Sequence, residues 1–256
     1  MVIILQNIGS LFIKFSRHTG RFFLFLSESI YSGVKRPYYL KQILNQFIQI
    51  GYFSLPVVGL TAIFSGMVLA LQSHTGFSRF DAEGAIATVV VLSITRELGP
   101  VLAGLMVAGR IGASMAAEIG TMKVTEQLDA LTTLSTDPIK YLVFPRIIAG
   151  VLMMPLLVLI ADIIGVFGGY LVAVYKLGFN PSIYLKQTLQ YLEMKDVISG
   201  LIKASVFGLI ISTMGSFQGY FSKRGAEGVG KATTNAVVGA SIMILFINYA
   251  LTALLF

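Results

Sequence analysis

Thr95-Arg96-Glu97-Leu98-Gly99-Pro100 places a cation beside an anion inside a long apolar stretch. Apolar residues run from Gly84 to Thr95 before the two charges and from Val101 to Gly109 after them. A helix that crosses a membrane through both runs therefore carries two charges near its middle. Each charge at a bilayer centre costs roughly 2.5–3.5 kcal/mol on insertion scales, so we expect the two side chains to face a protein cavity rather than lipid.

Two interpretations of Arg96-Glu97 are open at this point. The residues can form an ion pair that only clamps two helices, or they can belong to a functional site. The Gly99-Pro100 pair that follows favours the second, because it frees backbone carbonyls and loosens the helix where a cavity would need it.

The stretch 111–131 follows directly and favours a helix, but it is too polar to cross a membrane. We expect it to lie outside the bilayer, with its apolar side covered by lipid headgroups or by a partner protein. The apolar residues of that side are Met115, Ile119, Met122, Val124, Leu128 and Leu131.

The composition indicates one integral membrane domain over residues 1–256. Of the 256 residues 55% are hydrophobic and only 12% are charged, and the mean hydropathy is +0.81. Cysteine is absent and the two histidines lie far apart, which excludes a disulfide framework and a cysteine or histidine metal cluster. The net charge of +7 is typical of a membrane protein with basic cytoplasmic loops, so no nucleic-acid partner is expected.

The apolar pattern predicts an all-α fold with an N-terminal helix and five spans. Residues 1–30 alternate apolar and basic faces at helical spacing, as in an amphipathic helix that lies in the headgroup layer. Each predicted span exceeds the roughly 20 residues that cross a bilayer. The third is over-long and carries Pro155, so it can tilt, kink or protrude. The spans are about 47–72, 84–109, 142–175, 197–221 and 234–256.

The loops predict the orientation. With the N-terminus in the cytoplasm, thirteen lysines and arginines lie on that side of the predicted spans and four on the other. Positive charge favours the cytoplasmic side, which places the C-terminus outside and residues 111–141 in the cytoplasm.

A glycine-rich stretch and two further charges within spans are the remaining candidate sites. The stretch from Gly225 to Lys231 resembles a phosphate-binding loop, but Ala232 replaces its magnesium-binding hydroxyl and a membrane span precedes it, so we expect a connector and no ATP site. Asp162 and Lys203 are the other charges within spans, and each needs a partner on another helix, a cavity or a route to the interface. A proton relay of Glu97, Asp162 and Lys203 in an ion-coupled transporter is the alternative function.

The run from Thr95 to Ala130 resembles the signature of MlaE-type permeases, the membrane subunits of lipid-transporting ABC systems that work with MCE-domain proteins. Shorter matches support the resemblance, which covers nearly the whole chain after the first few dozen residues. They are Gly66–Gln72, Asp137-Pro138, Pro145-Arg146, Lys203 and Leu251–Leu254.

The resemblance implies a homodimer of five-span subunits that moves phospholipid between the inner and outer membranes and maintains outer-membrane lipid asymmetry. It implies a cytoplasmic ATPase that binds ATP and magnesium, with no cofactor, metal or catalytic residue on this chain. An MCE-domain lipid-binding protein would sit on the outer side, and a small cytoplasmic accessory subunit is an optional partner. The location is the bacterial inner membrane, with an organelle envelope as the alternative.

The resemblance also assigns roles to individual residues. The coupling helix would be the stretch around Ala116–Leu131. This chain departs from the family at Asn248, where the family often has an acidic residue. An ion pair between Lys203 and the last span is therefore in question. Asp162 has no role that the family assigns. The cavity residues would be Leu69, Phe77, Phe80, Arg96 and Glu97, and the ATPase-docking residues Glu118, Gly120, Met122, Glu126 and Leu128.

Overall fold

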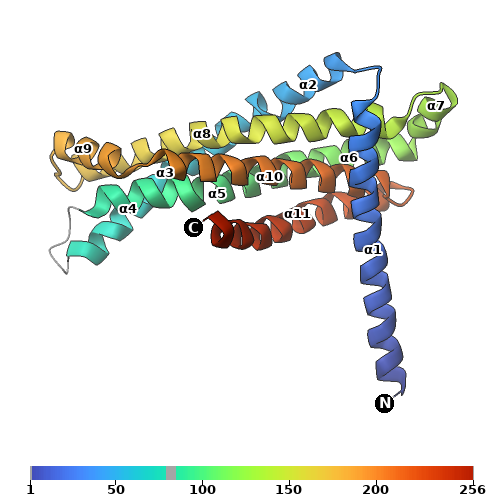
Figure 1. The fold of residues 1–256 in the computed structure, drawn as a ribbon, viewed down its shortest axis with the longest axis horizontal. Helices are drawn as coiled ribbons and strands as arrows, with labels where there is room; N and C mark the ends of the chain where they lie inside the picture. Colours follow the sequence, from blue (N-terminus) through green and yellow to red (C-terminus); the bar gives the residue numbers. More distant parts are fainter. Residues whose placement is uncertain (1, 79–84, 256) are drawn as a thin grey trace.

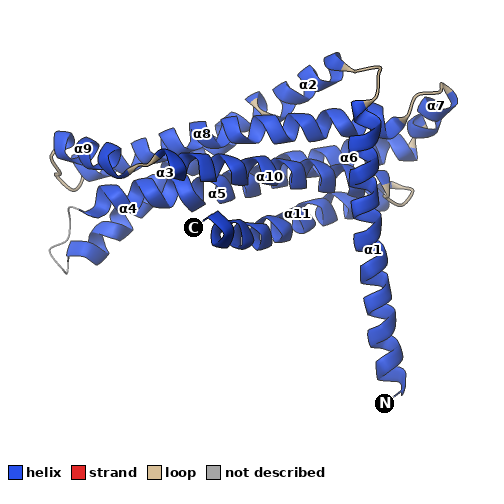
Figure 2. Ribbon diagram, viewed as in Figure 1, coloured by secondary structure: helices blue, strands red, loops and turns tan. Residues whose placement is uncertain are grey.

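A computed structural model describes residues 2–78 and 85–255, so Phe80 of the predicted cavity lies outside the described residues. Throughout those two ranges the ordered elements are helices, without a strand (Figure 2). This described part contains five helical stretches that are long and apolar enough to cross a membrane, which confirms the all-α membrane fold. They are Leu40–Phe77, Ile86–Val124, Ile139–Tyr175, Met194–Tyr220 and Ala226–Leu255.

Several of these stretches are built from shorter elements. The first contains α2 (Leu40–Ile50), the 3₁₀ turn η1 (Tyr52–Ser54) and α3 (Leu55–Phe77). The second contains α4 (Ile86–Ser93), α5 (Gly99–Val107) and α6 (Ala113–Val124), joined by the π-helical turns η4 (Ile94–Leu98) and η5 (Ala108–Gly112). The third contains the π-helical turn η6 (Ile139–Val143) and α8 (Phe144–Tyr175), and the last two are α10 (Met194–Tyr220) and α11 (Ala226–Leu255).

The over-long third span is one helix through its proline. α8 continues without a break past Pro155, so the predicted length is correct and the helix does not end at that residue. Neighbouring helices stabilise it, because α8 packs closely against both α3 and α10.

The N-terminal helix predicted for residues 1–30 is present as α1 (Val2–Val34). Figure 1 shows it running across one end of the bundle rather than along it, the orientation that a helix in the headgroup layer requires. Its second half is anchored by aromatic contacts: the rings of Phe22 and Phe25 lie 5.5 and 5.6 Å from that of Phe217 on α10.

Two short helices mark the ends of the bundle. α7 (Gln127–Thr133) lies at the end that α1 crosses, and α9 (Pro181–Tyr191) lies at the opposite end beside α4 (Figure 1). We refer to these as the α7 end and the α9 end.

The prediction of a single helix over 111–131 is wrong. The second span continues as α6 to Val124, and the chain then turns before α7 begins. The turn is made at Glu126, whose backbone φ of 59° is left-handed and cannot continue a right-handed helix.

The expected cover by headgroups or a partner protein is wrong for two residues of its apolar side, while Val124 remains 37% exposed. Met115 and Ile119 are buried against the chain's own α10 and α11, rather than by headgroups or a partner. The close approach depends on α10 glycines, since a Cβ added at Gly219 would lie 2.9 Å from the carbonyl oxygen of Ala116. Small residues let membrane helices approach in this way.

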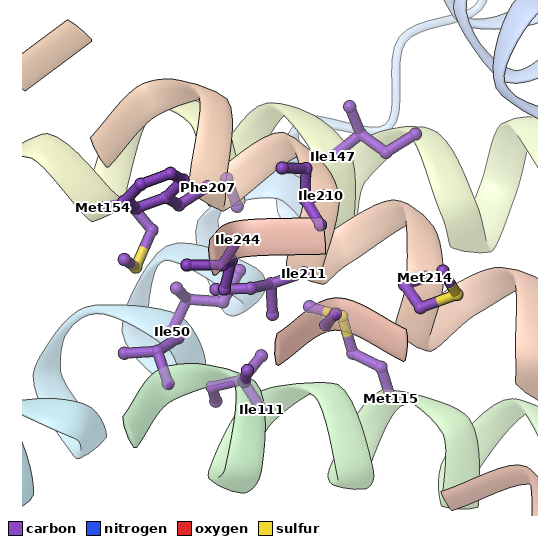
Figure 3. Packing of buried hydrophobic residues seen from close by; sticks show 14 of the residues in the cluster. Ile50, Ile111, Met115, Ile147, Met154, Phe207, Ile210, Ile211, Met214 and Ile244 are labelled. Atoms are coloured by element: carbon purple, nitrogen blue, oxygen red, sulfur yellow. The ribbon is translucent and has the colours of Figure 1, made fainter. Parts of the chain in front are cut away.

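The main apolar core lies between α8, α10, α11 and the second span. Figure 3 shows Phe207 and Ile211 of α10 beside Ile244 of α11, with Ile111 of the second span below them. α8 and α10 cross where two glycines meet, because a Cβ added at Gly208 would overlap the carbonyl oxygen of Gly150.

We predict that Gly208→Ala destabilises the protein by about 1–3 kcal/mol, because the added methyl group forces two packed helix backbones apart. The matched control is Gly230→Ala on α11, where an added Cβ meets nothing within 4 Å and the better helix propensity of alanine is the only effect. Thermal unfolding in detergent measures both variants. Equal melting temperatures for the two would contradict the close crossing.

Candidate functional site

The charged stretch of the second span forms the π-helical turn η4, directly before α5. Pro100 has no N–H, so it leaves a carbonyl of the preceding turn without its helical donor. The backbone carbonyl of Arg96 instead accepts a hydrogen bond of 2.9 Å from Lys203 Nζ. The freed carbonyl predicted from Gly99-Pro100 is therefore present, and a side chain from another span uses it.

Arg96 and Glu97 do not pair with each other, so the predicted ion pair is wrong. Arg96 Nε lies 2.8 Å from Asp196 Oδ1, and Glu97 Oε1 lies 2.7 Å from Lys203 Nζ. Adjacent side chains on a helix, such as Arg96 and Glu97, point in different directions. Their partners Asp196 and Lys203 are two helical turns apart along α10, so each of the two charges can reach a different one. Each charge of the second span thus finds its own partner on the same neighbouring helix.

The Lys203 side chain has no solvent-exposed surface. An ammonium has three hydrogen-bond donors, and here they reach Glu97 Oε1, the Arg96 carbonyl and Thr252 Oγ1, the last at 2.8 Å. All three donors are satisfied. Of the three alternatives left open for Lys203, the structure shows a partner on another helix, and its partners come from the second and fifth spans.

Asn248 completes the cluster from the last span. Its Nδ2 donates a hydrogen bond of 2.9 Å to Glu97 Oε2, while Thr252 Oγ1 lies 3.0 Å from Glu97 Oε1. The Asn248 amide can donate this hydrogen bond to the Glu97 carboxylate in its ordinary state. An acidic residue at position 248 would have to be protonated before it could donate one. Lys203 does have a partner on the last span, and that partner is Thr252.

Asp196 is the site residue that sequence reasoning missed. Its side chain is 1% exposed, and its Oδ2 accepts a hydrogen bond from the Glu193 backbone N–H at the start of α10. The spacing Glu193-x-x-Asp196 before an apolar run is the pattern of a helix capping box, so the sequence did carry a signal for the helix start. No local signal links Asp196 to Arg96, which lies 100 residues earlier.

The cluster lies in the part of the bundle nearer the α9 end. Arg96 follows the first residue of α4 by ten positions and Lys203 follows that of α10 by nine, which is about 15 Å of helix from the α9 end. The side chains of Arg96 and Glu97 keep 35% and 36% exposure, so both remain accessible from outside the fold.

The other predicted cavity residues lie elsewhere. Leu69 and Phe77 pack against a separate apolar cluster of α3 and α4 that includes Ala70 and Val90. Asp162 is buried on α8, and no hydrogen bond joins it to Glu97 or Lys203 within the described part of the chain. The proton relay therefore lacks a continuous path here, and the lipid-lining role of Leu69 and Phe77 stays a prediction.

The residues predicted to dock an ATPase lie in three different environments. Gly120 and Leu128 are buried, and Met122 is half-buried in the same cluster as Leu128. Glu118 forms an ion pair of 2.8 Å with Arg146, which is 5% exposed. Glu126 is exposed at the turn before α7, and the docking role of all five stays a prediction.

A comparison with protein families matches residues 43–254 to the family described as Permease MlaE. The chain belongs to the MlaE permease family. The match spans all five membrane stretches and the charged cluster, so it confirms the resemblance of the run from Thr95 to Ala130.

Relatives of known name match most of the chain. A probable ABC transporter permease protein of Rickettsia felis is 64% identical over 99% of this chain and 98% of its own length. The intermembrane phospholipid transport system permease protein MlaE of Haemophilus influenzae is 35% identical over 98% of this chain and 97% of its own. A chloroplastic Arabidopsis thaliana protein, TRIGALACTOSYLDIACYLGLYCEROL 1, is 38% identical over 83% of this chain and 61% of its own. This MlaE-family chain is therefore an ABC transporter permease and a multi-pass membrane protein.

We predict that Glu97→Ala destabilises the permease by up to about 3–5 kcal/mol, because it leaves the Lys203 ammonium buried without its carboxylate. Adding Lys203→Met removes that charge and should restore most of the lost stability. Thermal unfolding of wild type, both single variants and the double variant in detergent measures the coupling.

The control for this cycle is Glu227→Ala, which breaks the exposed i,i+4 pair between Glu227 and Lys231. Its expected effect is below about 1 kcal/mol. If the double variant were no more stable than Glu97→Ala alone, an unpaired ammonium would not be the cause.

Proposed function

We propose that this permease moves phospholipid between the inner and outer membranes and so maintains outer-membrane lipid asymmetry. The observation that carries the proposal is the charged cluster within the spans. In it Arg96 and Lys203 lie beside two carboxylates, one amide and one hydroxyl, and Arg96 remains partly exposed. A guanidinium matches a phosphate diester in charge and geometry. The printed name of the Haemophilus influenzae relative, which is that of a phospholipid transport permease, supports the same substrate.

The apolar residues near the α9 end would hold the acyl chains. Leu69 and Phe77 lie in the second half of α3, toward the α9 end, and Phe80 follows them in the sequence. In this proposal the headgroup phosphate meets Arg96 and the chains extend along these side chains, as a site with apolar walls and few polar contacts requires.

A second copy of the chain would complete the pathway. Arg96 and Glu97 are partly exposed within a membrane-spanning stretch, where charges face a protein interior or a water-filled cavity rather than lipid. A cavity between two subunits meets that requirement, and an MCE-domain protein on the outer side would receive the lipid from it.

A partner protein would supply the energy for transport, because we propose that this chain binds no nucleotide. A cytoplasmic ATPase that binds ATP and magnesium would dock at the α7 end, with a small accessory subunit as an optional addition. The excess of lysine and arginine in the loops at that end supports an N-terminus in the cytoplasm and a C-terminus in the periplasm of a bacterial inner membrane. The Arabidopsis relative, whose name reads chloroplastic, keeps an organelle envelope as the alternative location.

We predict that Arg96→Ala reduces ATP-dependent lipid transfer by at least about tenfold, because the phosphate loses a charge-assisted contact. Some stability should be lost, because the Asp196 carboxyl is 1% exposed and loses its cation. The fold should persist, since that carboxyl can take up a proton and keeps its hydrogen bond from the Glu193 N–H. Arg96→Lys should recover only part of the activity, because an ammonium lacks the planar fork of a guanidinium.

Transfer between vesicles by the reconstituted complex, measured beside the melting temperature, tests this prediction. Lys231→Ala removes an exposed cation at the α7 end and serves as the control, with transfer expected near the wild-type rate. A stability loss in Arg96→Ala that matches its activity loss would favour a structural clamp and overturn the substrate role.

The docking proposal is tested most cleanly at Glu126. We predict that Glu126→Lys releases the ATPase while the permease stays folded, because a charge of the wrong sign at an interface costs several kcal/mol. The backbone at Glu126 is left-handed and accepts either side chain equally, so the change acts through charge. Glu118→Lys is a weaker test, since it also breaks the internal ion pair with Arg146.

Co-purification of the ATPase from detergent measures the outcome. Glu28→Lys, a charge reversal at an exposed position on α1, is the matched control and should retain the ATPase. Full retention by Glu126→Lys, with normal coupled turnover, would remove Glu126 from the docking surface.

A further inference from the structure

Arg96 is held by α10 at two places. Its backbone carbonyl accepts a hydrogen bond of 2.9 Å from Lys203 Nζ, and its side-chain Nε donates one of 2.8 Å to Asp196 Oδ1. An arginine side chain has many rotamers, so its backbone position alone does not decide where the guanidinium lies. The contact at Nε restricts the direction in which this planar group points.

Asp196 is itself immobilised, because its two carboxylate oxygens have different partners. Oδ1 accepts the hydrogen bond from Arg96, whereas Oδ2 accepts one of 3.1 Å from the backbone N–H of Glu193. The second contact belongs to the capping box at the start of α10, in which the Glu193 side chain accepts in return from the backbone N–H of Asp196. The carboxylate cannot turn away from Arg96 without losing its contact to the helix start.

The two helices that carry this pair touch each other at the same level. Gly200 follows Asp196 by about one turn of α10, and a Cβ added at Gly200 would overlap the carbonyl oxygen of Thr95. Thr95 directly precedes Arg96 in the sequence. Since the backbones are in contact here, the distance from Asp196 to the backbone of Arg96 is fixed by packing.

The two members of the pair differ in burial. The Asp196 side chain is 1% exposed, whereas that of Arg96 is 35% exposed within a membrane-spanning stretch. The anion is therefore part of the packed interior, and the cation extends from it to the surface of the fold. Asp196 is a fixed support, and Arg96 is the member that a molecule outside the fold can reach.

We propose that Asp196 is the positioning residue of the lipid site: it orients the Arg96 guanidinium toward the phosphate of the transported phospholipid and does not itself contact the lipid. The inference rests on the proposed function, in which Arg96 meets that phosphate. A guanidinium binds a phosphate through parallel hydrogen bonds from a planar fork, so the contact depends on orientation as well as on charge. Asp196 also supplies the counter-charge that a cation within a span needs while no lipid is bound.

The test is a double-mutant cycle on the reconstituted complex, with ATP-dependent phospholipid transfer between vesicles as the readout. Asp196→Ala should reduce transfer at least about fivefold, because Arg96 keeps its charge but loses the charge-assisted contact that orients it. Added to Arg96→Ala, the same substitution should change transfer by less than about twofold, because a positioning residue acts only through the residue that it orients. A purely structural role would lower transfer by the same factor with or without Arg96.

A control variant separates positioning from helix capping. Glu193→Ala removes the other side chain of the capping box at an exposed position and leaves the contact between Arg96 and Asp196 in place. Its melting temperature in detergent should fall because a helix cap is lost, while transfer should stay within about twofold of wild type.

Asp196→Asn is the second variant, and it carries the test if Asp196→Ala fails to fold. It keeps the volume of the side chain, but an amide has one oxygen and cannot accept at both positions that the carboxylate serves. Any contact that remains with Arg96 is no longer charge-assisted, so transfer should fall at least about threefold.

The outcomes separate this inference from the proposed function. Wild-type transfer by Arg96→Ala would overturn the phosphate role of Arg96, and the role of Asp196 with it. If Arg96→Ala loses transfer, three results would overturn the positioning role alone: wild-type transfer by both Asp196 variants, an equal loss in Glu193→Ala, or the same loss from Asp196→Ala with and without Arg96. If transfer by Arg96→Ala is too slow for a further loss to be measured, the difference between Asp196→Ala and Glu193→Ala decides the outcome.

Discussion

The buried ammonium of Lys203 is the constraint on which the rest of the bundle depends. It has no exposed surface, and an uncompensated charge in a membrane interior is unstable unless other helices supply its partners. Glu97 and the Arg96 carbonyl come from the second span and Thr252 from the fifth. Separating the fourth span from either neighbour would leave a donor without an acceptor, so the three helices are held as one unit.

The turn that meets Lys203 is shaped by small local features of the sequence. Pro100 withholds an N–H from the preceding turn, and η4 widens the helix there. Gly200 lets α10 approach the Thr95 carbonyl, since a Cβ on Gly200 would overlap that oxygen. Gly99 admits Asp162 from α8. One short stretch of the second span thus brings two other spans into contact with its backbone.

This arrangement keeps two kinds of chemistry apart within a few ångströms. The side of the turn that faces α10 and α11 presents Arg96 and Glu97, whose charges are compensated by Asp196 and Lys203 of α10. The side that faces α8 and α9 presents apolar walls with an isolated carboxyl and phenol. Charges are costly in hydrocarbon, so the charged side of the turn is covered by protein partners while the other side is mainly apolar.

The sequence alone determined the five spans and the charges inside them, because the bilayer thickness sets the length of an apolar run that can cross it. It also determined the family, because the family signature is a contiguous stretch of sequence. It also indicated the freed carbonyl, which follows from the chemistry of Pro100. Only the tertiary structure decided that Arg96 pairs with Asp196 and Glu97 with Lys203, because adjacent side chains diverge around a helix and packing selects partners 100 or more residues away. Tertiary packing also decided what covers α6. The sequence pattern showed that one side of α6 is apolar, but only the structure showed that Gly215 and Gly219 let α10 pack closely against it.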